Sequence, residues 1–443
     1  MPLILKDRRT IKMFWDEEYE KMPREDMEQM QIERLQSTLN RVYKNVPYYK
    51  KLFDEKNIIS EEINSREDLS QIPFTTKKTL RESYPYGMFA VPLREVVRIH
   101  SSSGTTGKPT VVGYTRNDLK HWSELMARVM TMAGVTKDDA CQIAFDYGLF
   151  TGGFGFHYGA ELIGASVVPT SLAAPEKQIH IMRDYKTTVL CCSPSFALSI
   201  AESLKSMEID PNELSLRVGI FGSEPWSEKM RDRLHNSLYL SAFDTYGLSE
   251  IMGPGVASEC EEKKGLHLFE DHYIAEIINP DTGEVLPHGE TGELVLTTIT
   301  KEAVPMIRYR TGDLTQIVDV PCTCGRTSHL LSRITGRTDD MFVVHGQKIM
   351  PGQIESILAD VEHTEPHYQL IIERQGGLDE LEIQVEVSEN LPFDEVKTLM
   401  KIQEEIKERV YKTFGIHVRV KLVEPRTFQR SREKKKVIID NRP

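Results

Sequence analysis

Ser101-Ser102-Ser103-Gly104-Thr105-Thr106-Gly107-Lys108-Pro109-Thr110 is a stretch of small and hydroxyl-bearing residues between two strand-like runs. VVRIH precedes it, and VVGYTRNDLKHW, which has the pattern of a short strand followed by a helix, comes after it. Glycines let a backbone approach a ligand closely, while hydroxyl groups and a lysine can donate to phosphate oxygens. The stretch is therefore a candidate phosphate-binding loop, and the alternative is a flexible surface turn.

This loop does not fit the P-loop of nucleotide triphosphatases. That motif needs a glycine, four further residues and then Gly-Lys followed by Ser or Thr. Counted back from Gly107, the first glycine position holds Ser102, and the final hydroxyl position holds Pro109. Both anchor positions fail, so any phosphate is bound in a different way.

The chain on either side of the loop alternates between strand and helix patterns. Between residues 96 and 333, four β-branched runs end in small or polar residues: VVRIHS, ASVVPT, TVLCCS and RVGIFGS. This pattern predicts an α/β domain with largely parallel strands. Residues 1–95 are expected to be mainly helical, with Met27, Met30, Ile32, Leu35, Leu39 and Val42 on one helix face.

A second, smaller domain is expected after a boundary at 334–340. YQLIIER and LEIQVEV are typical of strands joined by the turn QGGLDE, and IHVRVKLV is a further strand. A helix between them is indicated by Phe393, Val396, Met400, Gln403, Ile406 and Val410. The predicted organisation is a large domain over 1–333 and a small α+β domain over 334–443.

Composition excludes several classes of protein. The 443 residues hold 55 Lys and Arg against 67 Asp and Glu, a net charge of -12, which argues against binding to nucleic acid or to an anionic membrane. No run approaches the roughly 20 apolar residues of a membrane span, and the N-terminus becomes charged too early for a secretory signal. Six cysteines do not make a disulfide framework. A cytoplasmic enzyme is the expectation.

Three further motifs follow the loop in order: Tyr246-Gly247-Leu248-Ser249-Glu250, Tyr309-Arg310-Thr311-Gly312-Asp313-Leu314 and Gly336-Arg337-Thr338-Asp339-Asp340. Together they resemble the adenylate-forming superfamily. Three further segments are similar to segments of phenylacetate–CoA ligases: Phe145 to Glu161, Phe221 to Glu228 and the early VPYYKKLF. The resemblance runs from about residue 10 to the C-terminus. It implies a large α/β domain, a small mobile α+β domain and a homodimer.

The implied reaction joins an aryl carboxylic acid to coenzyme A in two steps. The acid attacks the α-phosphorus of ATP, giving an acyl adenylate, and the CoA thiolate then displaces AMP. The resemblance places Glu250 and Thr105 at Mg²⁺, Asp313 at the ribose and Arg337 at the ribose or α-phosphate. It assigns the remaining nucleotide contacts to Ser101, Ser102, Ser103, Gly104, Thr106, Gly107, Lys108, Ser223, Glu224, Pro225, Asp244, Thr245, Tyr246 and Gly247. Without the motifs around them, the simpler interpretation would be that Asp313 is a surface carboxylate in a turn and Tyr246 is a tyrosine of the core.

The adenylation lysine of the superfamily lies near the C-terminus. Aligning Arg430-Ser431 and the terminal Val-Ile-Ile-Asp implies that Lys434 has this role. Glu433 stands where the family usually has glycine, and Lys435 and Lys436 leave the register open. The resemblance also implies rotation of the small domain about a hinge near Asp339, and it assigns Gly346, Lys348 and Pro351 to the pantetheine channel of CoA.

The acyl pocket is expected around Tyr147, Phe150, Gly152 and Gly153. Aromatic walls and glycine space suit a flat aryl group, although the same residues could simply pack in the core. Phenylacetate, indole-acetate, another aryl acid and a bile-type acid all stay open as substrates.

A structural zinc site is a further candidate. Cys322-Thr323-Cys324 gives half of a tetrahedral set, and Cys260 with His267 could complete it, with His272 as the rival fourth ligand. The alternative is four unconnected residues, one of them a reduced surface thiol. Two other functions stay open: an adenylating enzyme that passes its acyl group to a carrier protein or an amine, and a zinc-containing interaction module.

Overall fold

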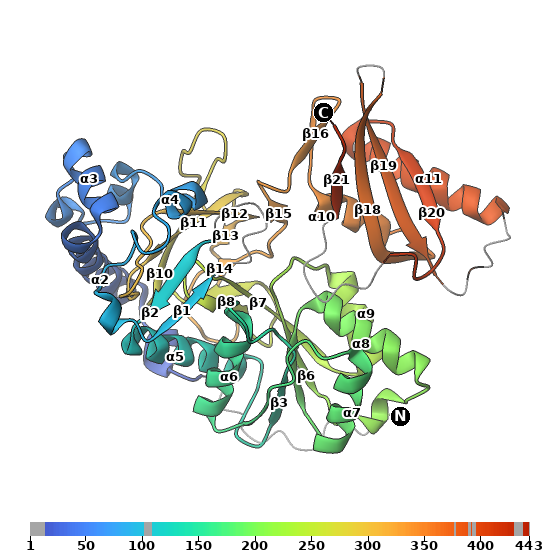
Figure 1. The fold of residues 1–443 in the computed structure, drawn as a ribbon, viewed down its shortest axis with the longest axis horizontal. Coiled ribbons are helices and arrows are strands. Elements are labelled where there is room, and N and C mark those ends of the chain that lie inside the picture. Colours follow the sequence, from blue (N-terminus) through green and yellow to red (C-terminus); the bar gives the residue numbers. More distant parts are fainter. Residues whose placement is uncertain are drawn as a thin grey trace. The chain divides into compact units, whose positions relative to one another are not determined.

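The computed structural model describes residues 14–101, 109–375, 378–388, 391, 396–428 and 437–442. The chain divides into two compact units. The large unit comprises Met1–Ser223, Arg233–Thr311 and Thr315–Arg333, and the small unit comprises Glu224–Asp232, Gly312–Leu314 and Ile334–Pro443. Figure 1 labels their elements.

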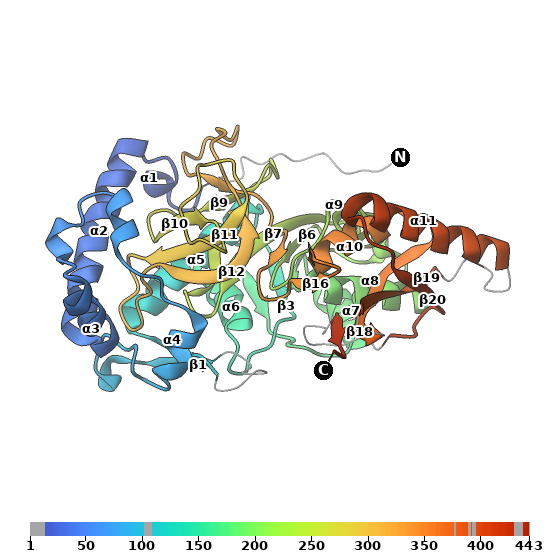
Figure 2. The ribbon, with the colours of Figure 1, turned by 90° about the horizontal axis from the view of Figure 1, so that it is seen from above.

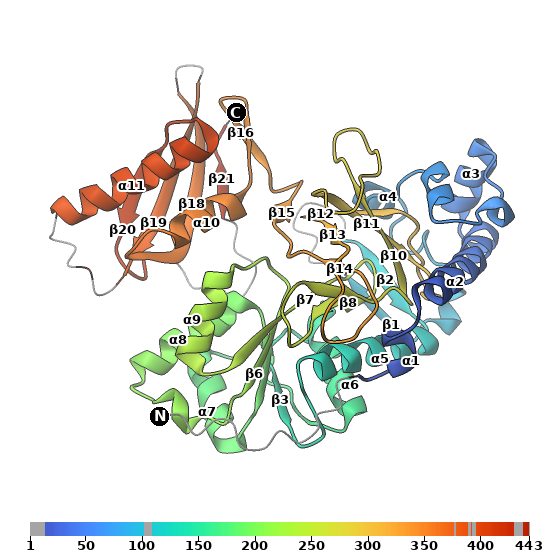
Figure 3. The same ribbon diagram turned by 180° about the vertical axis from the view of Figure 1, so that it is seen from behind.

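A nine-stranded sheet forms the centre of the large unit (Figure 3). From β7 outward, one side is parallel and consists of β7 (Ser241–Leu248), β6 (Val218–Phe221), β5 (Val189–Cys192), β3 (Ala140–Ile143) and β4 (Ser166–Val168). The other side is antiparallel and consists of β8 (Gly253–Glu259), β9 (Leu266–Leu268), β14 (Leu330–Leu331) and β13 (Ile317–Val318). Strand β7 is therefore the place where the strand direction changes.

Helices pack against this sheet, as a parallel sheet requires. They are α5 (Arg116–Met132), α6 (Gly152–Ile163), α7 (Pro175–Tyr185) and α8 (Pro194–Ser206). Helix α9 (Glu228–Leu238) begins in the small unit and ends in the large one. All residues of β5 and β6 are buried, which explains their uninterrupted apolar sequences. Helix α5 packs closely on α6, where Gly159 has no room for a side chain beside Met126.

The expected strand VVRIHS forms, but outside the parallel sheet. Strand β1 (Arg98–Ser101) pairs antiparallel with β2 (Val111–Tyr114) in a separate ribbon, so this part of the parallel-sheet prediction is wrong. The phosphate-loop candidate joins these two strands. The ribbon is possible because a loop of about nine residues can connect antiparallel neighbours without a crossover helix.

The N-terminal helical prediction is confirmed over the described residues. Elements α1 (Glu17–Glu20), α2 (Arg24–Asn45), α3 (Pro47–Lys56), η1 (Ser60–Glu62), η2 (Glu67–Gln71), α4 (Lys77–Glu82) and η3 (Leu93–Glu95) are helical. On α2, Gln31 and Thr38 are buried among the apolar residues, which the periodicity did not indicate. Gln31 Nε2 donates to the carbonyls of Glu270 and Tyr273, at 2.8 and 3.1 Å, so its buried amide nitrogen is satisfied by two backbone acceptors.

A four-stranded sheet has the order β10 (Tyr273–Ile278), β11 (Gly292–Thr298), β12 (Tyr309–Thr315) and β15 (Gly336–Arg337). The middle of β12, Gly312–Leu314, belongs to the small unit. There Asp313 pairs with Arg337 and Leu314 with Gly336.

The small unit has its own core. It contains a hairpin of β16 (Phe342–Val344) and β17 (Gln347–Ile349), helix α10 (Pro351–Ala359), and a sheet of order β20 (Arg419–Val423), β19 (Leu378–Val387), β18 (Thr364–Gln375) and β21 (Ile438–Asp440). Helix α11 (Val396–Phe414) covers this sheet (Figure 2). Buried apolar residues join these elements, among them Ile354, Leu358, Leu370, Ile383, Ile406 and Val410.

The helix and three strands predicted for this unit are present as α11, β18, β19 and β20, and β16, β17, α10 and β21 are additions. The predicted helix face needs correction, because Val396 is 64% and Met400 61% exposed, while Ile402, Ile406 and Val410 are buried. Phe393 lies outside the described residues. Over the described part of the chain, no helix has the length and apolar character needed to cross a membrane.

Candidate active site and metal cluster

Strand β7 carries Asp244, Thr245, Tyr246 and Gly247 at the point where the sheet changes direction. The Asp244 amide donates to Glu259 at 2.7 Å, and its carboxylate is 3.3 Å from Arg333 Nε. A side chain at position 247 would lie 2.3 Å from the Gly253 carbonyl, so only glycine fits there. Asp244, Thr245 and Tyr246 are each at most 9% exposed. This segment is therefore held rigidly.

Glu250 follows β7 and is 8% exposed. The Thr110 hydroxyl donates to Glu250 Oε1 at 3.4 Å, and the Ser101 amide donates to the Leu149 carbonyl at 3.1 Å. Both ends of the phosphate-loop candidate are thus anchored, one at Glu250 and the other at the acyl-pocket segment. Ser102, Ser103, Gly104, Thr105, Thr106, Gly107 and Lys108 lie outside the described residues.

Strand β6 leads into Ser223, Glu224 and Pro225, the segment predicted to lie at the adenine. Gly222 is required here, because a Cβ on it would lie 2.5 Å from the Thr245 carbonyl. Ser223 adopts a positive φ of 74° and is exposed. Glu224 and Pro225 belong to the small unit, where Glu224 is half-buried.

Asp313 and Arg337 come from motifs that are distant in sequence and form an ion pair across the β12–β15 ladder. Arg337 also donates to both carboxylate oxygens of Asp339, at 2.8 and 3.2 Å. Gly312, at a φ of 79°, has Arg337 Nη2 3.0 Å from where a Cβ would be. Asp313 is 5% exposed. A buried carboxylate and a guanidinium thus lie side by side, as recognition of a ribose and a phosphate would require.

The residues predicted for the CoA channel lie on the β16–β17 hairpin and at the start of α10. His345 and Gly346 form its two-residue turn, with φ of 50° and 77°, the conformation that favours glycine. Gly346 and Lys348 are exposed, and a Cβ on Gly346 would meet nothing within 4 Å. Pro351 is the first residue of α10. Lys434 lies outside the described residues.

The acyl-pocket candidates lie around the start of α6. Tyr147 packs edge-on against Phe154, and its hydroxyl is 3.2 Å from His157 Nδ1. Phe150 is 38% exposed. Gly152 and Gly153 are buried, and a Cβ on either would lie 2.7 Å from Phe150 or Asp146. These two glycines allow neighbouring residues to pack closely against the backbone. The space that the sequence suggested for a substrate at these positions is therefore filled by Phe150 and Asp146.

Arg98 is a residue that the sequence reasoning missed. Its guanidinium lies 4.9 Å from the Phe154 ring centre and 4.8 Å from that of Tyr158, and it donates to the Tyr158 hydroxyl at 2.7 Å. It therefore brings a positive charge to the aromatic cluster of the acyl-pocket segment. An arginine within the strand-like run VVRIHS was the only signal available.

Cys260, His267, Cys322 and Cys324 form one cluster, here called the cysteine cluster, whose four ligand atoms lie within 4.8 Å of one another. The Sγ atoms of Cys260 and Cys322 are 3.6 Å apart, and Cys324 Sγ is 3.4 Å from His267 Nε2. Tetrahedral zinc, with Zn–S of about 2.3 Å and Zn–N of about 2.0–2.1 Å, separates such ligand atoms by roughly 3.5–3.8 Å. The donor set therefore fits a closed zinc site.

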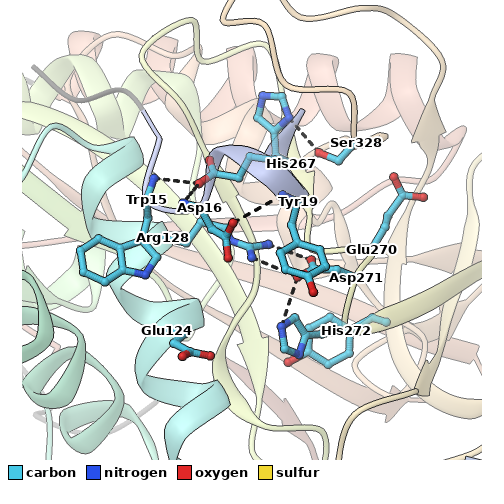
Figure 4. A network of polar contacts seen from close by, with 12 residues as sticks. Trp15, Asp16, Tyr19, Glu124, Arg128, His267, Glu270, Asp271, His272 and Ser328 are labelled. Atoms are coloured by element: carbon cyan, nitrogen blue, oxygen red, sulfur yellow. Dashed lines mark hydrogen bonds and ion pairs between the residues drawn. The ribbon is translucent and has the colours of Figure 1, made fainter. Parts of the chain in front are cut away.

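The rival ligand His272 lies elsewhere. Its Nδ1 is 2.7 Å from Thr300 Oγ1, and its Nε2 is 3.2 Å from Asp271, so both ring nitrogens are engaged. Figure 4 shows His272 beside the buried Arg128–Asp271 pair, while His267 points to Ser328, with its Nδ1 3.1 Å from the Ser328 hydroxyl. Burial alone would raise the pKa of Asp271, but the Arg128 charge holds it well below its usual range.

Comparison with known proteins gives a consistent result. Residues 28–300 match the family model of AMP-binding enzymes, and residues 346–442 match that of the AMP-binding enzyme C-terminal domain. The chain is 45% identical to a phenylacetate-coenzyme A ligase of Thermus thermophilus, over 95% of this chain and 97% of the relative. It is 43% identical to a phenylacetate-coenzyme A ligase of Escherichia coli, over 94% and 95% of the two chains.

A solved structure extends the likeness to the fold. The crystal structure of 2-hydroxyisobutyryl-CoA ligase in the postadenylation state superposes with a TM-score of 0.91 at 26% identity, covering 97% of this chain and 92% of that chain. The mixed α/β fold with a large and a small domain is therefore that of adenylate-forming enzymes. The fold, the family-model matches and the identity to these relatives over nearly the full length agree. The chain belongs to the phenylacetate–coenzyme A ligase family of the adenylate-forming superfamily.

Proposed function

We propose that the protein joins an aryl carboxylic acid, phenylacetate or a close analogue, to coenzyme A through an acyl-adenylate. The observation that carries this proposal is 43–45% identity, over nearly the whole chain, to relatives named phenylacetate-coenzyme A ligase. The products are the aryl-acyl-CoA, AMP and pyrophosphate.

The nucleoside is proposed to bind along the strands. Asp313 accepts hydrogen bonds from the ribose hydroxyls, because a carboxylate is an acceptor that can serve two donors at once. Its ion pair with Arg337 keeps a positive charge beside this position, where an α-phosphate oxygen would gain from it. Asp244, Thr245, Tyr246 and Gly247, with Ser223, Glu224 and Pro225, form the proposed adenine contacts.

The triphosphate and the acid are proposed to meet at the phosphate loop. Mg²⁺, which prefers oxygen ligands, would neutralise phosphate charge when bound. Glu250 supplies a buried carboxylate at the end of this loop, and Thr105 is the second proposed ligand. Lys434 is proposed to stabilise the charge that develops as the carboxylate attacks the α-phosphorus.

The aryl group is proposed to lie against the aromatic residues around Tyr147 and Phe150. The Arg98 guanidinium, which already contacts Phe154 and Tyr158, adds a charge able to attract the carboxylate into this region. Gly152 and Gly153 are proposed to shape the loop rather than to leave space. Gly346, Lys348 and Pro351 are the proposed contacts of pantetheine.

The cysteine cluster is proposed to hold a structural Zn²⁺. Its three sulfur donors and one imidazole leave no open position, so the ion would stabilise the fold and take no part in the reaction. Ser328 would orient His267 through its other ring nitrogen. A homodimer and a cytoplasmic location stay predictions.

The direct test supplies the protein with ATP, Mg²⁺, CoA and one acid at a time, and detects acyl-CoA by mass spectrometry. The acids are phenylacetate, indole-acetate, a bile-type acid, and acetate as the aliphatic control. Aryl-acyl-CoA with equimolar AMP is the expected result. Formation of an enzyme-bound acyl-adenylate without acyl-CoA would instead support a carrier protein or an amine as acceptor. Absence of both products with every acid would contradict the proposal.

A further inference from the structure

A second group of side chains of the types that ligate metals lies in the large unit, outside the cysteine cluster and outside the candidate active site. It consists of His288, Asp319 and His329, here called the histidine cluster, whose ligand atoms lie within 4.8 Å of one another. His288 Nδ1 is 2.8 Å from Asp319 Oδ2, and His329 Nε2 is 3.0 Å from Asp319 Oδ1. The two imidazole rings meet nearly perpendicular, with centres 5.1 Å apart.

The backbone brings these three residues together. Asp319 directly follows β13 and His329 directly precedes β14, and these strands pair through Val318 and Leu330. The turn that carries His288 is fastened to β13, because the Gly289 amide donates to the Ile317 carbonyl at 2.8 Å. The cluster is therefore positioned by main-chain hydrogen bonds, and it does not depend on the chance approach of long side chains.

A buried carboxylate orients His329. Its Nδ1 is 2.8 Å from Glu270 Oε1, and its amide donates to Glu270 Oε2 at 2.8 Å. Glu270 is 1% exposed and also accepts from Arg24. Metal-binding histidines commonly donate their second ring N–H to a carboxylate in this way, which fixes the ring and directs the other nitrogen to the ion. Here that other nitrogen, Nε2, faces Asp319.

We propose that His288, Asp319 and His329 form a second Zn²⁺ site with three protein ligands and one position open to water. Imidazole and carboxylate are ligands that zinc accepts, and three protein ligands with one open position is a common arrangement around it. The nitrogen–oxygen separations of 2.8 and 3.0 Å need to widen by only a few tenths of an ångström to surround an ion.

The two metal sites should behave differently. The cysteine cluster is buried and offers three sulfurs, whereas the side chains of His288 and Asp319 are 37% and 57% exposed and offer nitrogen and oxygen. The histidine cluster therefore binds zinc more weakly and exchanges it more readily. Its ion would link the 288 turn to the β13–β14 ribbon.

The test measures zinc bound to the full-length protein after equilibrium dialysis, first at one equivalent and then at a moderate excess. Wild type should bind a second zinc ion. His288→Gln and Asp319→Ala, both at exposed positions, should weaken this second ion at least about 10-fold. His180→Gln, which changes an exposed histidine on α7, is the matched control and should keep both ions.

Cobalt identifies which site each ion fills. The first Co²⁺ should give the thiolate-to-cobalt absorption of a cysteine site, and the second should add visible bands without further thiolate absorption. Cys324→Ser should alter the first signal and keep the second. A single zinc ion in wild type, or two ions of unchanged affinity in both histidine-cluster variants, would overturn the proposal, leaving the cluster as a set of ion pairs.

Discussion

The strands that carry the nucleotide candidates and the hairpin that carries the CoA candidates differ in their surroundings. On β7 and β12, Asp244, Thr245 and Asp313 are at most 9% exposed and held by hydrogen bonds or ion pairs. On the β16–β17 hairpin, Gly346 and Lys348 are exposed, and Gly346 has open space around it. The strand residues are therefore held in place by neighbours within the protein, whereas the turn of the hairpin is exposed.

This difference suggests a division of labour. A preorganised group can bind the AMP part of the substrate in both half-reactions, because that part is present throughout. The exposed hairpin turn takes no part in the proposed contacts to AMP, so we expect its residues to matter for thioesterification alone.

The largest effect is expected at the C-terminal lysine. Lys434→Ala should slow adenylation by about 10²–10³-fold, as the loss of one preorganised donor to a developing charge does, and should leave conversion of supplied acyl-adenylate to acyl-CoA unchanged. Single-turnover assays of the two half-reactions measure this. Lys435→Ala and Lys436→Ala are matched controls; an equal loss in both half-reactions, or a larger loss at Lys435, would show that the assignment is wrong.

The next largest effect concerns the buried strand region. Asp313→Ala should raise the KM for ATP by roughly 10–100-fold, because charge-assisted hydrogen bonds contribute about 1.5–3 kcal/mol. The affinity for acyl-adenylate should fall by a similar factor, since the ribose is common to both ligands. Asp339→Asn removes the other carboxylate charge on Arg337 and should leave the KM for ATP near the wild-type value. If Asp313→Ala affected only one half-reaction, the strand region would not serve both steps as proposed.

On the hairpin side, Gly346→Ala should lower the rate of thioesterification up to about 10-fold and leave ATP–pyrophosphate exchange unchanged. Alanine both adds a methyl group and strains a backbone at φ 77°. Gly346→Asn separates these causes, because asparagine tolerates this conformation. If the asparagine variant is fully active, the defect is strain; if both variants slow exchange as well, the hairpin is not specific to the second step.

Zinc removal tests the rigidity of the strand region indirectly. Cys324→Ser should release zinc from the cysteine cluster and lower the melting temperature by roughly 5–10 °C, with a smaller loss for Ser328→Ala, which removes only the contact to His267. The kcat of the folded fraction should change little. Calorimetry with metal analysis measures both, and an unchanged zinc content in the cysteine variant would refute the ligand set.

The smallest effect is a pH dependence in the core of the large unit. Burial lowers the pKa of Lys301 to about 8, and its ammonium lies 3.3 Å from the Tyr114 ring centre. Between pH 8 and about 10.5 the unfolded chain binds more protons at this lysine, so the free energy of unfolding should rise with pH. In urea titrations, the free energy of unfolding of the wild type relative to that of Lys301→Met should rise by up to about 1.4 kcal/mol per pH unit over this range. If the difference between the two unfolding free energies did not change with pH, Lys301 would be solvated rather than buried.

Much of this molecule could be predicted from its sequence, and the exceptions have physical causes. Strand runs such as VLCC and VGIF identified the parallel sheet because both faces are buried. The run VVRIHS has the same local pattern but pairs antiparallel with β2, and pairing partners are not encoded in a single strand. Likewise, Gln31 is buried because it serves two carbonyls from a segment about 240 residues away.

Some residues of the candidate sites could likewise be predicted from the sequence, whereas others are brought together only by the fold. Cysteine and histidine spacing pointed to the cysteine cluster, since few residue types bind metals through sulfur. The contacts of Arg98 with Phe154 and Tyr158, and the meeting of His288, Asp319 and His329, arise only from tertiary structure. Neither Arg98 nor any member of the histidine cluster belongs to a local motif that would mark it.

ATP–pyrophosphate exchange with phenylacetate in the absence of CoA shows directly whether the protein forms an acyl-adenylate. Formation of an acyl-adenylate predicts exchange that requires the acid, proceeds without CoA, and turns into net AMP and phenylacetyl-CoA production when CoA is added. Exchange that requires CoA, or ADP and phosphate as products, would contradict an adenylate intermediate and with it the proposed function.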